Sequence, residues 1–263
     1  MKHLLLILTF ILISCGQEVG DPSVTYLQAQ TTENLDVLFK SMSDFTMEVH
    51  YEVGAEPYAG STSNGNKVWG LTESNVKAIF EGRGQSVNYH IPKELNEMHQ
   101  FADQAKSTWT TSELLNLEKS LRQQKHGGSN GNFFIVFVNG HFKYSDGEVN
   151  KDIIGVSLTG TTVIAIFKDV ISQYSAEPGV AKFMEQATII HEFGHAIGLV
   201  NNGVALTSSH QDSQKGAHCS NSDCVLYWAN EGRSDMVSFI RKFILSGKTV
   251  MFDQACLDDV KAY

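Results

Sequence analysis

Two histidines and a glutamate form the clearest chemical motif of this 263-residue chain. His191, Glu192 and His195 have the spacing H-E-x-x-H, and Gly198 follows three residues later. In a helix, residues four apart lie on one face, so His191 and His195 can share a metal ion. Glu192 stands beside the first ligand, where a carboxylate can act as general base toward a water molecule. The motif therefore predicts a catalytic zinc site.

The residues before the motif predict the element that positions it. The run 178–190 starts with a proline and carries apolar residues at helical spacing. Gly198 can end this helix because glycine readily adopts a left-handed conformation. We expect a long amphipathic helix that carries both histidines and Glu192.

Strands and helices are expected to alternate elsewhere in the chain. Apolar alternation and turn residues predict strands at 45–53, 86–91, 133–138, 142–144 and 161–167. Asn139-Gly140 suggests a hairpin turn between the third and fourth of these. Helical spacing predicts helices at 72–80 and 111–121, with further candidates at 233–245 and 253–260. The fold class is α/β or α+β, with the zinc helix packed beneath a sheet.

The N-terminus predicts export. Residues 1–14 combine a lysine with about ten apolar residues, which fits a signal peptide and is too short to span a bilayer comfortably. Residues 12–15 resemble the bacterial lipoprotein box, in which Cys15 becomes the lipid-modified first residue. Gly16 is not the aspartate that retains such lipoproteins at the inner membrane, so the expected location is the outer membrane. An ordinary signal peptide or anchor helix with an incidental cysteine is the alternative.

The composition limits partners and domain number. A net charge of −9 disfavours binding to nucleic acid or to an anionic membrane surface. The polar stretch after Cys15 is expected to be a tether, so the chain divides into a signal peptide (1–14), a tether (15–40) and a catalytic domain (41–263). Export also permits a disulfide among Cys219, Cys224 and Cys256.

A catalytic zinc ion needs a third protein ligand, and the sequence offers two candidates. His218 is followed directly by Cys219 and, five residues later, by Cys224. With the H-E-x-x-H-x-x-G motif, this pattern resembles the metzincin clan of zinc peptidases, and its spacing resembles the H-C-x4-C-x-M of the archaemetzincin branch. The resemblance implies that His218 is the third ligand. His210, which lies in what looks like an inserted segment at 202–217, is the alternative.

The chain departs from this pattern at two positions. Asn201 occupies the place of the third histidine of most metzincins, and Leu226 occupies that of the methionine under the metal. The leucine is a tolerable replacement, because this residue supports the site by packing rather than by binding metal.

The resemblance implies a twisted mixed sheet over a long active-site helix, with a C-terminal helical subdomain. It also implies one catalytic zinc ion and hydrolysis of peptides or proteins, with Glu192 as general base. Peptides are expected to pair with the strand 162–167. Tyr227 could reach the oxyanion of the tetrahedral intermediate in this hydrolysis, although a tyrosine beside a packed turn is more often structural.

Two alternatives stay open. The chain could be a lipid-anchored zinc-binding protein without turnover, although the intact Glu192 favours catalysis. Cys219 and Cys224 are expected to form a disulfide, which leaves Cys256 unpaired. The competing hypothesis is a second, thiolate-rich zinc site as in the resembled branch.

Overall fold

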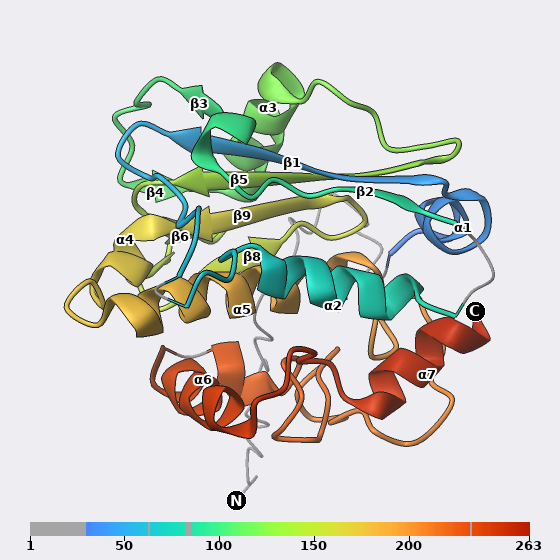
Figure 1. Cartoon of the computed structure of the whole chain (residues 1–263). Helices are drawn as coiled ribbons and strands as arrows, with labels where there is room; N and C mark the ends of the chain where they lie inside the picture. The colour runs from blue at the N-terminus through green and yellow to red at the C-terminus, as the bar shows by residue number, and fades with distance from the viewer. Residues whose placement is uncertain (1–29, 63, 83–85, 232) are drawn as a thin grey trace, which may run out of the picture.

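The computed structural model describes residues 30–62, 64–82, 86–231 and 233–263. Within these residues, a six-stranded mixed sheet forms the upper part of the molecule, and helices cover both of its faces (Figure 1). This is the mixed α/β architecture predicted from the sequence, with a long helix beneath a twisted sheet. The expectations for the signal peptide and for Cys15 lie outside the described residues.

The sheet is parallel except at one edge. Its order is β2 (Asn88–His90), β1 (Asp44–Glu52), β5 (Asn130–Val138), β9 (Val163–Phe167) and β8 (Gly155–Ser157), and β3 (His99–Phe101) also pairs with β1. Strand β8 runs antiparallel to β9, its only partner strand in the described sheet. Strands β5 and β9 are almost entirely buried, as the central strands of a parallel sheet must be.

Helices form layers above and below this sheet. Helix α3 (Thr111–Leu121) covers the upper face, and α2 (Gly70–Phe80) and α5 (Pro178–Ala196) lie beneath it (Figure 1). The short helix α4 (Lys168–Ser172) leads from β9 toward α5. The core between sheet and α5 is aromatic, because the Phe193 ring lies 5.0 Å from that of Phe133 and 5.9 Å from that of Phe45.

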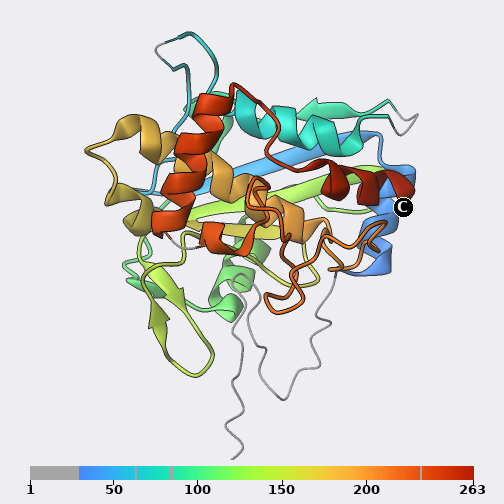
Figure 2. The same ribbon diagram turned by 90° about the horizontal axis from the view of Figure 1, so that it is seen from below.

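A third layer lies below α5. It contains η3 (Trp228–Glu231), α6 (Arg233–Ser246), α7 (Gln254–Ala262) and the loops that follow α5 (Figure 2). Helix α6 packs against α5, and α7 packs against α2. The C-terminal helices predicted from sequence are therefore confirmed, and they enclose the motif helix from below.

The folded body starts earlier than expected. Helix α1 (Thr32–Asp36) is followed directly by a π-helical turn, η1 (Val37–Ser41). Leu35, Leu38 and Phe39 are at most 3% exposed and belong to the core. The predicted tether therefore cannot extend to residue 40, because these apolar side chains are buried against the rest of the protein.

The predicted hairpin at Asn139-Gly140 is wrong. The following strand, β6 (His141–Lys143), pairs in parallel with β4 (Thr108–Trp109) and antiparallel with β7 (Val149–Asn150) in a separate small sheet. Gly140 has a φ of +85°, and a Cβ there would lie 2.4 Å from the Ser107 carbonyl oxygen. The turn therefore directs the chain toward Ser107 and away from β5.

The other predicted elements match the structure to within a few residues. Helices α2, α3, α5, α6 and α7 and strands β1, β2, β5 and β9 were expected, whereas α1, α4, β3, β4, β7, β8 and the short turn η2 (Leu95–Glu97) were not. Among the described residues, no helix is both long and apolar enough to cross a membrane.

Candidate metal centre and active site

Helix α5 holds the motif in a fixed position. From Met184 to Val200 every residue is buried, because the sheet lies above the helix and the C-terminal layer lies below it. Glu185 accepts a 2.5 Å hydrogen bond from Lys168, the first residue after β9, and its second oxygen accepts from the Tyr58 backbone N–H. Burial raises the pKa of Glu185 to about 7, against the opposing effect of Lys168. These contacts fix the helix to the sheet ahead of the histidines.

The structure brings His191, His195 and His218 together. One ring nitrogen from each lies within 4.8 Å of the other two, and all three side chains are buried. The Nε2 atoms of His191 and His195 are 3.1 Å apart. Two nitrogens that bind one zinc ion tetrahedrally lie ~3.3 Å apart, so the spacing fits such an ion.

Backbone carbonyls orient two of these rings. His191 Nδ1 lies 2.7 Å from the Val225 oxygen, and His218 Nδ1 lies 2.5 Å from the Lys215 oxygen. In each ring, a protonated Nδ1 donates a hydrogen bond to this carbonyl oxygen, which leaves Nε2 as the metal-binding nitrogen. Burial, and secondarily the other two histidines, lowers the pKa of His195 well below its usual value. A neutral imidazole is the form that binds metal.

Glu192 lies beside this cluster and lines a small pocket with His191. The remaining lining residues come from the edge strand, from α5 and from the C-terminal layer: Ile154, Gly155, Thr188, Asn230 and Met236. We call this the Thr188 pocket. A carboxylate next to a three-histidine cluster and an open pocket is the arrangement that general-base hydrolysis requires.

A turn from the C-terminal layer supports the motif from below. A Cβ at Gly194, between Glu192 and His195, would lie 2.9 Å from Leu226 Cδ2 and 3.0 Å from Phe252 Cε1. Leu226 is fully buried. It therefore packs directly beneath the metal-binding helix, as the sequence analysis expected of this position.

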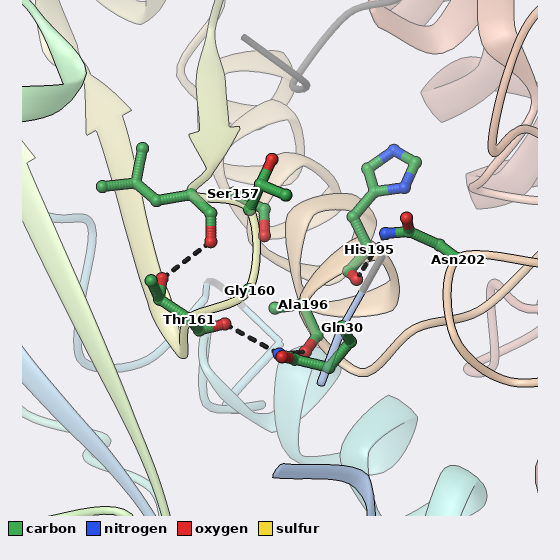
Figure 3. Close-up of a pocket in the computed structure, with 9 residues that line it drawn as sticks. Gln30, Ser157, Gly160, Thr161, His195, Ala196 and Asn202 are labelled. Carbon is green, nitrogen blue, oxygen red and sulfur yellow. Dashed lines mark hydrogen bonds between the residues drawn. The ribbon is translucent and has the colours of Figure 1, made fainter. Parts of the chain in front are cut away.

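The C-terminal end of α5 is fixed by hydrogen bonds (Figure 3). Gly198 has a φ of +82°, and Asn202 Nδ2 donates a 3.1 Å hydrogen bond to the His195 carbonyl oxygen. Gln30 Nε2 donates to the Ala196 carbonyl at 2.6 Å and to the Thr161 carbonyl at 2.8 Å. The first described residue thus connects the end of the metal-binding helix to the β8–β9 hairpin. Sequence reasoning missed Gln30, which stands in a polar stretch without any local pattern.

His210 lies in a second cluster, away from the three histidines. Its Nδ1 is 3.6 Å from Cys219 Sγ and 4.0 Å from Cys256 Sγ, and Cys224 Sγ is 3.7 Å from Cys256 Sγ. Around one tetrahedral zinc ion, sulfurs lie ~3.8 Å apart and a sulfur and a nitrogen ~3.6 Å apart. The donor set and its spacing therefore fit a second zinc ion.

Acidic residues surround this second cluster. His210 Nε2 donates to Asp259 Oδ2 at 2.7 Å, which leaves Nδ1 to face the sulfurs. Asp253 caps α7 by accepting from the Cys256 backbone N–H, and its other oxygen lies 3.5 Å from Cys219 Sγ. A carboxylate oxygen of Asp253 is also close enough to the other donors to be a ligand. The structure therefore places His210, the alternative third ligand, with the cysteines and not with His191 and His195.

The expected Cys219–Cys224 disulfide is not formed. Cys219, Cys224 and Cys256 are free, buried thiols. Hydrogen bonds from Cys224 and Cys256 lower the pKa of the Cys219 thiol well below its ordinary value. Burial raises the pKa of Cys224 well above its ordinary value. The sequence spacing between Cys219 and Cys224 could not show that Cys256 and His210 approach both sulfurs.

In the sheet that the structure describes, β8 is the edge strand beside the three-histidine cluster. Strand β9, which was expected to pair with substrate, lies between β5 and β8 and offers no free edge. Gly155, the first residue of β8, lines the Thr188 pocket beside Glu192. A peptide paired with β8 would therefore pass along the three-histidine cluster.

The sequence matches no protein-family model and no curated protein. Among solved structures, archaemetzincin from Archaeoglobus fulgidus complexed with malonate is similar, at 13% identity and a TM-score of 0.40. A zinc-dependent peptidase from Methanocorpusculum labreanum is similar at 10% identity and a TM-score of 0.45. Each similarity covers 81% of this chain and 99% of the other.

Proposed function

We propose that this protein is a zinc-dependent endopeptidase that hydrolyses peptides or proteins outside the cytoplasm. The observation that carries the proposal is the convergence of three histidine nitrogens beside Glu192 and strand β8, whose only partner strand among the described residues is β9. His191, His195 and His218 would hold the metal. This leaves the fourth zinc position open for catalysis, as in other three-ligand sites.

The chain's own groups have distinct tasks in this reaction. A bound zinc ion would supply the Lewis acidity that polarises the scissile carbonyl and lowers the pKa of water. Glu192 accepts the proton of the attacking water and passes it to the leaving nitrogen. The edge of β8 holds the peptide extended through backbone hydrogen bonds. Tyr227 packs against Trp228, with ring centroids 5.8 Å apart, and has no assigned task.

The variant Glu192→Gln tests turnover. It should keep the bound zinc and the fold but lose about 10²- to 10⁴-fold in hydrolysis of a denatured protein, because the carboxylate is not a ligand. The wild-type activity should also disappear with a chelator and return with zinc. A wild-type protein that binds zinc and cleaves nothing would support the alternative of a zinc-binding protein without turnover.

We further propose that the protein holds two zinc ions and not one. The second ion would bind His210, Cys219, Cys224 and Cys256. We favour Cys224 over Asp253 as fourth ligand, because Asp253 already caps α7 and accepts from Asn221. Elemental analysis should find two zinc ions in the wild type. His218→Ala and His210→Ala should each lose one, and only His218→Ala should lose the ion that supports hydrolysis.

The N-terminal lipid anchor remains a proposal from sequence. Cys15 would carry lipid and place the protein at the bacterial outer membrane. Cys15→Ser should move the protein from the membrane fraction to the soluble exported fraction. An unmodified mass for the mature wild-type N-terminus would contradict it.

A further inference from the structure

The loop between α5 and η3 carries ligands of both proposed metal sites. His218 of the three-histidine cluster is followed directly by Cys219 of the second cluster. The segment 210–227, which we call the shared loop, also contains His210 and Cys224, and it forms isolated β-bridges but neither a helix nor a strand. One short segment therefore has to satisfy the geometry of both sites.

The shared loop also orients a metal-binding ring on helix α5. Val225, the residue after Cys224, accepts the 2.7 Å hydrogen bond from His191 Nδ1. Contacts of this kind fix the orientation of a metal-binding histidine. Cys224 thus stands next to the carbonyl that orients one ligand of the first site, and Cys219 stands next to another such ligand, His218. Any force that fixes the two sulfurs also fixes these two groups.

Helix α7 supplies a donor of the second cluster from outside the shared loop. Cys256 Sγ lies 3.7 Å from Cys224 Sγ and 4.0 Å from His210 Nδ1, and all three side chains are buried. Helix α7 packs against α2 and carries none of the three histidines. An ion bound at the second cluster would therefore connect the shared loop to a part of the fold that lies outside the first site.

The conformational entropy of the shared loop couples the two sites. A segment without helix or strand loses conformational freedom when its ligands are fixed, and this loss opposes metal binding. The ion that binds first bears this cost, and the second ion then binds to a loop that is already ordered. Such sharing gives positive cooperativity although the ions share no ligand. Couplings between two sites typically change affinity about 5- to 150-fold.

We propose that the second cluster positions the ligands of the three-histidine site, so that metal binding at either site strengthens metal binding at the other. Metal at the second cluster fixes Cys219 and Cys224, and through them His218 and the Val225 carbonyl. The expected gain in affinity is about tenfold, and linkage requires the same factor in both directions. A site weakened by this factor still fills at excess metal. The inference rests on the proposed pair of zinc sites.

Titration of the metal-free full chain with cobalt(II) tests the inference without turnover. Cobalt binds the same nitrogen and sulfur donors as zinc. Thiolate ligands give it an intense charge-transfer absorption that histidine ligands do not give, so the two sites are read separately. Cys256→Ala removes a donor of the second cluster without changing the shared loop or α5. Its three-histidine site should bind cobalt about tenfold more weakly than that of the wild type.

Two further variants complete the experiment. His195→Ala removes a ligand on α5, and the charge-transfer band should then show about tenfold weaker binding at the second cluster. This reciprocal arm decides the question if Cys256→Ala does not fold. Val260→Ala is the matched control, because Val260 is fully buried on α7 and its truncation leaves all metal donors in place. Both affinities of this control should stay close to those of the wild type.

The outcomes separate this inference from the proposals on which it rests. Unchanged cobalt affinity of the three-histidine site in Cys256→Ala, or a coupling seen in one direction only, would overturn the inference and leave both metal sites in place. An equal loss in Val260→Ala would overturn it too, because loosening of α7 would then be the cause. A wild type that binds a single cobalt ion would overturn the pair of sites and this inference with it. Because no arm measures hydrolysis, failure of the peptidase proposal would not alter these results.

Discussion

Leu226 offers a quantitative test of how the C-terminal layer supports the metal-binding helix. Its side chain is fully buried and packs against Gly194. Leu226→Ala removes three carbons at a site where the backbone of α5 cannot collapse inward, so we expect a loss of about 3 to 5 kcal/mol. In a domain of this size, that loss lowers the melting temperature by about 10 °C.

The same substitution should also weaken the binding of zinc. The preceding residue, Val225, accepts the hydrogen bond from His191 Nδ1, so a loosened turn releases the orientation of this ring. Loss of such a supporting contact corresponds to about a 10- to 100-fold weaker affinity for the metal.

Stability is measured by urea unfolding in the presence of chelator, and affinity by competition with a zinc indicator. Leu245→Ala is the matched control, because Leu245 is 87% exposed and the same truncation there should change stability by less than about 0.5 kcal/mol. Leu226→Met should cost less than about 1.5 kcal/mol, because it conserves volume. The reasoning is refuted if Leu226→Ala costs no more than the control.

Three further predictions follow from buried contacts. Burial, with a contribution from Arg122, lowers the pKa of His126 to about 4, so the unfolded chain binds a proton there first as the pH falls below about 6.5. Between pH 6.5 and 4, the free energy of unfolding of the wild type should therefore fall by about 1 to 2 kcal/mol more than that of His126→Gln, as measured by urea unfolding. The same pH dependence in both proteins would contradict this. Gly155→Ala should cost about 1 to 3 kcal/mol and lower kcat/KM, because its Cβ would displace β8 from Thr188; unchanged melting temperature and kcat/KM would count against it. Asp259→Asn should lower the zinc affinity of the second cluster about 10- to 100-fold while the zinc at the three histidines stays bound. A chelator titration in which the variant releases zinc as the wild type does would exclude a supporting role for Asp259.

Local periodicity explains what the sequence could predict. Helix α5 begins and ends almost where expected, because a proline, a helical apolar pattern and a glycine mark its limits. Strands β1, β5 and β9 were similarly visible as long apolar or alternating segments. The grouping of His191 with His195 follows from the same helix geometry.

The remaining features depend on contacts between distant parts of the chain. Strand β8 has three residues and starts at a glycine, so no pattern distinguishes it from a loop, yet it forms the edge beside the site. The second cluster joins His210, Cys219 and Cys256, which become neighbours only when α7 packs against the preceding loop. One error was avoidable, because Leu35, Leu38 and Phe39 have helical spacing within the segment that was read as a tether.

If Cys15 carries the proposed lipid, the position of Gln30 has a consequence for release of the protein from the membrane. Its side chain connects the end of α5 to the β8–β9 hairpin through two backbone carbonyls. A protease that cut the chain before Gln30 would leave these bonds in place and would free the whole folded body. A cut just after Gln30 would separate this side chain from the folded body and loosen the end of the metal-binding helix. The same proteolytic event, shifted by a few residues, would therefore either release the proposed peptidase intact or weaken its proposed metal site.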